Sequence, residues 1–339
     1  MAPEHYVIVG NGAAANRAAD VLRAGDPEGR ITLVSDEFSL FYYRHRLRDF
    51  LVGDAPEDAL VVRPASHYRD KGIRLRLGQT VVKADLSARV LFLKHMEKLH
   101  YTRLILCTGS KPRLPEVHYG YQKHFAVMKT LADARALRER MTGVKDVLIA
   151  GGDLVSVRLA AALLKKGRSV TFMVDRDSFW PLELTKERRD ELAQGLTRKG
   201  ARVLADDVMV GVAEAQGGGY EVTTRAGAKI RCDLVGAFFG LVPDVGFLLG
   251  SGLDLERGIL VNETLQTNYP DVWAAGDCAQ VYNPDIRNYW VSIGWGNAER
   301  LGEVAARNVL GQTVQAGRPA ESALRFGGIT VNTSWWKDF

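Results

Sequence analysis

The sequence contains few cysteines, and they form no recognisable reactive pair. Its 339 residues include Cys107, Cys232 and Cys278, with no C-x-x-C or C-x4-C spacing among them. Exchange between a dithiol and a disulfide needs two thiols that can cross-link, one of them held as a thiolate. The scarcity argues against disulfide-cycling chemistry and against a thiolate metal site. It favours a reduced, cytoplasmic location.

Long apolar runs and a strong charge of one sign are also missing. No stretch approaches the length that spans a bilayer, and the first apolar segment lacks the flanking features of a signal peptide. The net charge is +5, and no basic run alternates with aromatic residues. We therefore expect no membrane span and no nucleic-acid partner. With 46% apolar and 25% charged residues, the composition is that of an ordinary globular protein.

What the sequence does contain is one pattern that occurs twice: a strand, a glycine turn, a helix, a second strand and an acid. This order is typical of a unit that binds a dinucleotide. Two such units in one chain suggest two dinucleotides brought face to face. Hydride transfer between a nicotinamide and a flavin requires that arrangement.

The first copy spans residues 6–36 and follows the motif closely. Gly10 permits the sharp turn, Gly12 leaves no Cβ in the way of a pyrophosphate, and Ala15 replaces the usual third glycine. The helix that follows directs its N-terminal amides at the phosphates. Asp36 follows the second strand, where an acid binds the adenosine ribose. The candidate contacts in the turn are Gly10, Asn11, Gly12, Ala14 and Ala15.

The second copy spans residues 147–175 and is weaker. Gly151 holds the first glycine position and precedes Gly152, but Asp153 and Ser156 hold the second and third positions. Aspartate brings a negative side chain to the place where a pyrophosphate should meet bare backbone. Asp175 ends the second strand as a ribose-binding acid would, which favours NADH over NADPH. Gly151, Gly152 and Asp175 are the candidate NADH contacts. The alternative is a domain that keeps the fold and binds a nucleotide poorly or not at all.

With both units in place, the chain resembles the FAD-dependent pyridine nucleotide-disulfide oxidoreductase superfamily, and within it the branch of rubredoxin, ferredoxin and nitrite reductases. The similarity covers nearly the whole chain. Beyond the two turns it rests on L-I-L-C-T-G-S at 104–110, G-L-V-P-D at 240–244 and V-W-A-A-G-D-C at 272–278. It implies an α/β fold with two Rossmann-like dinucleotide-binding domains, as in glutathione reductase. It also implies FAD as a cofactor.

The resemblance assigns further residues to the flavin site. Asp277, after Gly276, falls on the acid that contacts the flavin's ribityl and pyrophosphate region. Arg44 falls on the arginine of the loop beside the flavin, and the backbone of Val81 on the strand that meets the adenine. Thr108 and Gly109 match the end of the family's A-T-G strand.

The same resemblance implies a division into domains. The flavin domain is expected to be discontinuous, with residues 1–112 and 240–320, and the NAD(P)H-binding-like domain to occupy residues 113–239. The family's C-terminal interface domain is expected to be largely absent. The tail at 321–339 carries Trp335, Trp336 and Phe339, which suggest docking onto a partner. A tail packed back on its own domain is an equal alternative.

Together these patterns predict an FAD-dependent oxidoreductase that takes hydride from NADH and passes electrons to a redox protein or partner subunit. No catalytic side chain is required, because the flavin does the chemistry. The alternative is an FAD-carrying electron-transfer or assembly subunit of a larger redox complex, with a degenerate nicotinamide site. Asp153, Ser156 and Arg158 motivate it, since Arg158 stands where the family usually has glutamate. Membership of an oligomer or complex is open in both cases.

Overall fold

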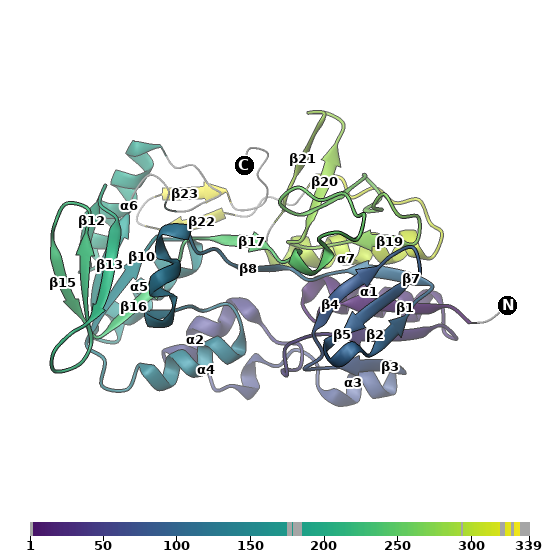
Figure 1. The fold of residues 1–339 in the computed structure, drawn as a ribbon, viewed down its shortest axis with the longest axis horizontal. Helices are drawn as coiled ribbons and strands as arrows, with labels where there is room; N and C mark the ends of the chain where they lie inside the picture. Colours follow the sequence, from purple (N-terminus) through teal and green to yellow (C-terminus); the bar gives the residue numbers. More distant parts are fainter. Residues whose placement is uncertain are drawn as a thin grey trace.

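Two parallel sheets form the framework of the molecule. The structure is a computed structural model that describes residues 3–174, 178, 185–292, 294–318, 323–326 and 329–332, the last two ranges by backbone only. Figure 1 shows two lobes, each built on one of these sheets. We call the lobe that contains β1 (His5–Val9) the first lobe and the one that contains β10 (Asp146–Ala150) the second lobe. This architecture confirms the predicted α/β class with two Rossmann-like units.

The sheet of the first lobe joins segments that are far apart in the sequence. Its strand order is β19-β7-β1-β2-β3, and every neighbouring pair is parallel. Its strands bury nearly continuous apolar runs in a core shared with helices α1 and α7. The elements are β1 (His5–Val9), α1 (Ala13–Gly25), β2 (Arg30–Val34), β3 (Ile73–Arg76), β7 (Arg103–Leu106), β19 (Val272–Ala274) and α7 (Trp295–Val309).

The sheet of the second lobe has the order β12-β11-β10-β16-β9 and is also wholly parallel. Phe172 in β11 is fully buried. The elements are β9 (Phe125–Ala126), α4 (Leu131–Arg140), β10 (Asp146–Ala150), α5 (Leu154–Lys165), β11 (Ser169–Val174), α6 (Lys186–Arg198), β12 (Arg202–Ala205) and β16 (Leu234–Ala237).

Smaller sheets, most of them antiparallel, complete the described part of the fold. Glycines 217–219 connect β13 to β14, which pair antiparallel as a hairpin. The three-stranded sheets are β4 (Val81–Asp85), β5 (Val90–Leu93) and β6 (Lys98–His100); β13 (Met209–Glu214), β14 (Tyr220–Thr224) and β15 (Lys229–Cys232); and β18 (Ile259–Val261), β20 (Ala279–Asn283) and β21 (Asn288–Trp290), in which β18 pairs parallel with β20. A hairpin is formed by β22 (Ala323–Phe326) and β23 (Ile329–Asn332).

The chain passes between the lobes along two paired strands. Strand β8 (Ser110–Pro112) leaves the first lobe, and β17 (Leu241–Pro243) returns to it in antiparallel register. Figure 1 shows this pair running between the two lobes. Because each crossing places its neighbours close to both lobes, residues beside β8 and β17 can contact groups from both.

A segment of the first part of the sequence packs into the core of the second lobe. Tyr42, Phe50 and Leu60 are buried among the side chains of α4, α5 and β10. This segment contains α2 (Leu47–Leu51), which contacts α4, and it precedes α3 (Ala65–Asp70). The two lobes therefore share apolar contacts beyond the two crossings. The domain limits expected from the sequence stay a prediction.

Helices α1 and α7 approach each other closely in the first lobe. Gly302 in α7 lies against the backbone of α1, because a Cβ built on it would be 2.1 Å from the carbonyl oxygen of Ala14. Leu301, Ala305 and Val309 form the apolar face of α7 and lie in the core. This contact places the middle of α7 beside the start of α1.

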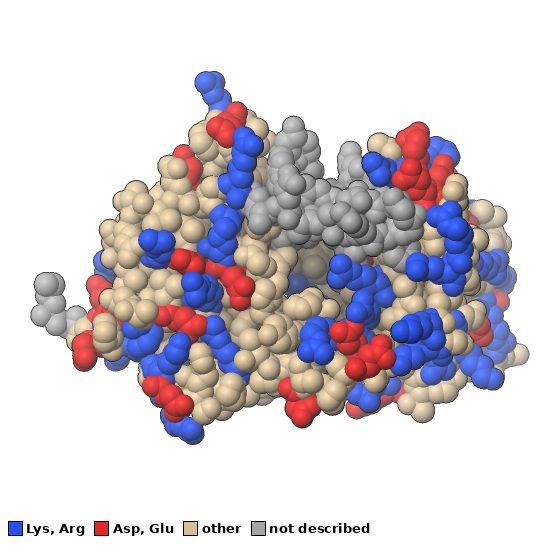
Figure 2. Space-filling view, turned by 180° about the vertical axis from the view of Figure 1, so that it is seen from behind, with Lys and Arg blue, Asp and Glu red and all other residues tan. Residues whose placement is uncertain are grey.

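Charged side chains of both signs are mixed on the surface. On the face seen in Figure 2, lysine and arginine alternate with aspartate and glutamate and form no single continuous basic area. Among the residues that the structure describes, no helix is long and apolar enough to cross a membrane, and no cluster of histidine, cysteine and acidic residues could hold a metal ion.

Candidate flavin and nucleotide site

The first glycine turn leaves the start of α1 open. Gly10 has φ +122°, and a Cβ there would lie 2.1 Å from the carbonyl oxygen of Cys107, so the position requires glycine. Gly12 is the N-cap of α1 and makes no side-chain hydrogen bond. No described atom lies within 4 Å of the Cβ position of Gly12. The free amides of the first helical turn therefore face open space, as an anion site needs.

Polar contacts hold the remaining turn residues in place. The Asn16 side-chain amide donates to the carbonyl oxygens of Asn11 and Gly12, at 3.1 and 3.0 Å. The Asn11 amide donates to the carbonyl of Ser39 at 3.2 Å. Ala14 and Ala15 are buried. These hydrogen bonds hold the backbone of the turn in place, and Asn11 contributes through its side chain.

The end of β2 carries two acids with different partners. Asp36 is exposed. Glu37 is half-buried, accepts a hydrogen bond from Tyr42 Oη at 2.6 Å and pairs with Arg44 at 2.6 Å. Arg44 also donates to the carbonyl of Lys129 at 2.8 Å. Arg44 therefore joins the loop of the first lobe to the second lobe, while Asp36 remains exposed for a ligand.

A lysine that the sequence interpretation missed lies next to the predicted flavin acid. Ser110 donates to Asp277 at 2.9 Å, and Lys129 donates to Ser110 at 2.8 Å, with its Nζ 4.0 Å from the Asp277 carboxylate. Burial lowers the pKa of Lys129 to about 8, although Asp277 opposes the shift. Gly276 has φ +84°, and a Cβ built on it would lie 3.3 Å from the Cβ of Ala14. The structure thus brings Gly276 and Asp277 to the start of α1.

Thr108 and Gly109 lie where β7 turns into β8. Gly109 has φ +70°, and its carbonyl accepts the amide of Asp244 at 3.0 Å. This places both residues between the end of β7 and the returning β17. Val81, by contrast, is buried at the start of β4 in the separate sheet β4-β5-β6.

An aromatic cluster covers the start of α7 and was also missed. Trp295 stacks on Phe41 with ring centroids 5.0 Å apart, and it contacts the rings of Tyr43 and His45 at 5.4 Å each. Gly294 precedes it as the N-cap of α7, with φ +104° and no side-chain hydrogen bond. Burial, Arg46 and Arg158 lower the pKa of His45. In the sequence, Gly294 is the feature that could have indicated the start of this helix.

The second glycine turn differs sharply from the first. Gly151 has φ +93°, and its Cβ position is 2.3 Å from the ring of Phe239; Gly152 has φ +76°. Asp153 is the N-cap of α5, and its carboxylate accepts the backbone N–H of Ser156 at 2.8 Å. The Ser156 hydroxyl oxygen accepts the N–H of Asp153 at 2.7 Å. This reciprocal capping box fills the start of α5 with side chains.

Two predicted features lie outside the described residues. Asp175, the candidate ribose-binding acid of the second unit, is one, and the aromatic residues Trp335, Trp336 and Phe339 are the other. Arg158 is described and exposed.

The three cysteines are free and buried. Burial raises the pKa of the Cys232 thiol to about 12 and raises those of Cys107 and Cys278 as well. The Cys278 thiol contacts the carbonyls of Leu106 and Ala275, each at 3.4 Å. None of the three is held as a reactive thiolate, and the structure contains no disulfide between them.

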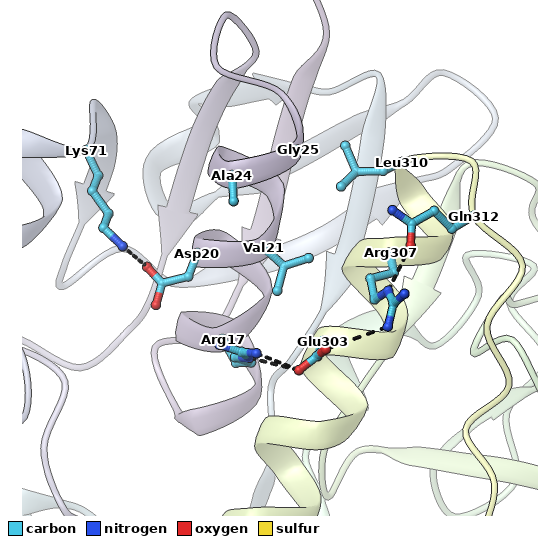
Figure 3. A pocket seen from close by; sticks show the side chains of 10 residues that line it. All are labelled: Arg17, Asp20, Val21, Ala24, Gly25, Lys71, Glu303, Arg307, Leu310 and Gln312. Atoms are coloured by element: carbon cyan, nitrogen blue, oxygen red, sulfur yellow. Dashed lines mark hydrogen bonds and ion pairs between the residues drawn. The ribbon is translucent and has the colours of Figure 1, made fainter.

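A separate hollow of about 570 Å³ lies on the outer side of α1 and α7. Figure 3 shows Arg17 and Arg307 directed at Glu303, and Lys71 directed at Asp20. These ion pairs measure 2.6, 3.8 and 2.8 Å. Because its charged groups satisfy one another, this hollow is a weaker candidate than the glycine turns.

Comparison with known proteins agrees with this geometry. The sequence profile of the family described as pyridine nucleotide-disulphide oxidoreductase matches residues 4–306. The ferredoxin–NAD(+) reductase component of the anthranilate 1,2-dioxygenase system from Burkholderia cepacia is 32% identical over 315 residues, which are 92% of this chain and 77% of the relative. Putidaredoxin reductase CamA from Pseudomonas putida is 29% identical, over 86% of this chain and 70% of the relative.

A solved structure shares the arrangement of both lobes. The covalent complex of putidaredoxin reductase with putidaredoxin contains a chain that matches with a TM-score of 0.87 and 25% identity. The match covers 98% of this chain and 81% of that chain. The matched family, the relatives and the two Rossmann-like sheets agree. The chain therefore belongs to the pyridine nucleotide-disulphide oxidoreductase family.

Proposed function

We propose that the protein is an FAD-dependent oxidoreductase that takes hydride from NADH and passes electrons to a protein redox partner. The observation that carries the proposal is the open turn at Gly12, at the start of α1 and next to Asp277. The similarity to reductases named for ferredoxin and NAD(+) supports the choice of donor and acceptor.

The described residues fit an FAD molecule. The diphosphate would lie on the bare N-terminus of α1, where Gly12 leaves room and the helix dipole favours negative charge. Asp36 would hold the adenosine ribose, and the backbone of Val81 the adenine. Asp277 and the segment Thr108–Gly109 would line the middle of the crevice, with Arg44 beside it.

This chain's own groups set the surroundings of the flavin ring. When bound, FAD supplies a ring that accepts hydride and releases electrons singly. Lys129 lies 4.0 Å from Asp277, and the first turn of α7 contacts Gly276 through Ala298. The positive charge and the helix dipole would stabilise negative charge there. Trp295 and Phe41, which stack at the start of α7, would shield that side of the crevice from water. No side chain is required as an acid or base.

The remaining parts of the proposal concern the partners and the location. The second unit, through Gly151 and Gly152, would receive NADH, and a redox protein or partner subunit would accept the electrons. Three buried, free thiols agree with a cytoplasmic location. We propose a soluble electron-transfer enzyme that works within an oligomer or a complex with its acceptor.

Anaerobic mixing with NADH and NADPH in parallel tests this function. The flavin absorbance should bleach faster and at lower concentration with NADH, and a ferredoxin or rubredoxin should reoxidise the flavin. A bound flavin that stays oxidised with both nucleotides would reject the proposal.

One observation favours a second candidate, an FAD-carrying electron-transfer or assembly subunit of a larger redox complex. The capping box of Asp153 and Ser156 occupies the start of α5, where a nicotinamide dinucleotide would place its diphosphate. This candidate predicts tight FAD, no measurable NADH affinity and copurification with a partner subunit. A lone monomer that turns over NADH would dismiss it.

A further inference from the structure

The two glycine turns of this chain occupy equivalent places but have opposite chemistry. Gly12 and Asp153 are the N-caps of the first helix in each unit. At Gly12 no side chain caps the helix, and the Cβ position faces open space. At Asp153 a carboxylate occupies the corresponding place. One chain therefore provides both an open turn and a filled turn.

The filled turn is well satisfied within the protein. Asp153 and Ser156 are both buried. The backbone N–H of Ser156 donates to the Asp153 carboxylate at 2.8 Å, and the backbone N–H of Asp153 donates to the Ser156 hydroxyl oxygen at 2.7 Å. The Ser156 hydroxyl also donates to the carbonyl of Asp153 at 2.8 Å. The amide of Ser156, which a diphosphate oxygen would need, already has an internal acceptor. A ligand must break this box or bind beside it.

Charge adds to the steric effect. The carboxylate of Asp153 faces the positive end of the α5 dipole and offsets the field that attracts phosphate. Burial raises the pKa of Asp153, whereas Lys129 acts in the opposite direction. Lys129 is itself engaged by Ser110 and lies near Asp277, so it is not a free cation for a diphosphate.

An aromatic ring covers the other end of the turn. The Phe239 ring lies 2.3 Å from the Cβ position of Gly151, and His118 stacks on the same ring at 4.8 Å. In the first unit, the atoms nearest to a Cβ built on Gly10 belong to Cys107. The second turn is therefore covered by side chains at both ends.

We propose that Asp153 is the residue that sets the nucleotide affinity of the second unit, by excluding a dinucleotide diphosphate from the N-terminus of α5. The inference rests on the proposed function, because it concerns the same NADH site. It implies that NADH binds this protein with its diphosphate displaced from α5, and more weakly than at an open turn.

The test measures binding of ADP-ribose, which carries the diphosphate but no hydride, to the FAD-loaded full chain by titration calorimetry. Asp153→Asn keeps an N-cap acceptor and removes the charge. The double variant D153G/S156G recreates the open turn. The control is Asp233→Asn, which removes one charge at the opposite end of β10, where Asp233 accepts the amides of Lys145 and Asp146.

The double variant should bind ADP-ribose at least about tenfold more tightly than the wild type, and D153N should show a smaller gain in the same direction. The D233N control should match the wild type. Equal affinities in the wild type, D153N and the double variant would overturn the proposal. If the double variant does not fold, D153N still decides, because asparagine is a good N-cap.

Flavin bleaching by NADH separates this inference from the proposed function. If NADH reduces the flavin of wild type and D153N with equal apparent affinity, the role proposed for Asp153 is wrong and the NADH reaction stands. If ADP-ribose binds the variants more tightly but NADH reduces none of them, the role of Asp153 stands and the NADH reaction falls.

Discussion

The two glycines of the first turn have separable roles at the residue scale. Gly10 is required by the backbone, because of its positive φ and the nearby carbonyl of Cys107. Gly12 has an ordinary φ of −87° and an open Cβ position. The fold therefore depends on Gly10, whereas Gly12 is predicted to matter for binding of the ligand.

Gly10→Ala should lower the free energy of unfolding by about 3 kcal/mol or more, since the new methyl group collides with backbone. Gly12→Ala is the matched control: it should change the unfolding free energy by less than about 1 kcal/mol but lower FAD affinity, because its methyl group points into the predicted diphosphate path. Urea unfolding and FAD content measure the two effects. Equal stability losses in both variants would contradict this separation.

Lys129 should make stability depend on pH. Burial lowers its pKa to about 8 in the folded chain, so between about pH 8 and pH 10 the unfolded chain binds more protons than the folded one. Stability attributable to this lysine therefore rises across that range, by about 3 kcal/mol at most, and is lost as the pH falls through 8.

The measurement is the difference in unfolding free energy between wild type and Lys129→Met at several pH values from 7 to about 10. The difference should shift in favour of the wild type as the pH rises. A difference that is constant with pH, or that shifts toward the variant, would show that Lys129 has an ordinary pKa.

At the scale of elements, the close contact of α1 and α7 positions the predicted flavin crevice. The contact depends on Gly302, because any side chain there meets the backbone of Ala14. Both helices start at a glycine N-cap without a side-chain partner among the described residues. The first turns of both helices lie close to Gly276, since a Cβ built on Gly276 would be 3.3 Å from the Ala14 side chain and 3.9 Å from the Ala298 side chain.

Gly302→Ala should destabilise the protein by about 3 kcal/mol and weaken FAD retention, because α7 must move away from α1. Gly296→Ala is the control in the same helix, since no described atom lies within 4 Å of its Cβ position. It should be neutral or stabilise by up to about 1 kcal/mol. Thermal unfolding compares the two. A stable G302A variant with full FAD content would refute this role for the helix contact.

Elements with a strong local pattern could be predicted from the sequence. The turn at Gly10 and Gly12, the strand at Val272–Ala274 and the helix face with Leu301 and Ala305 follow from glycine spacing and apolar periodicity, which are local properties. Gly294 and Trp295, where α7 begins, lie outside that apolar pattern.

Contacts between the lobes could not be predicted in the same way. Lys129 lies in the sequence of the second lobe, yet it reaches Ser110 and Asp277 because β8 and β17 bring those segments together. The sequence did identify Asp153 as unsuitable for a pyrophosphate. The capping box also had a local signal, an aspartate followed three residues later by serine.

At the scale of the whole molecule, electrons are expected to pass without a thiol. All three cysteines are buried with raised thiol pKa values. In the folded protein a thiol reagent should therefore react slowly with all three, and in denaturant it should react with three per chain. Anaerobic NADH should leave both counts unchanged. The appearance of two reactive thiols after NADH would indicate disulfide chemistry.

The central claim is that FAD lies along the first glycine turn, with its diphosphate on the start of α1. The most direct measurement is the absorbance spectrum and flavin content of the protein isolated in native form. We predict a yellow protein that holds one FAD per chain, identified after release, with reduced content in G12A. A colourless protein that takes up no FAD on reconstitution would contradict the account.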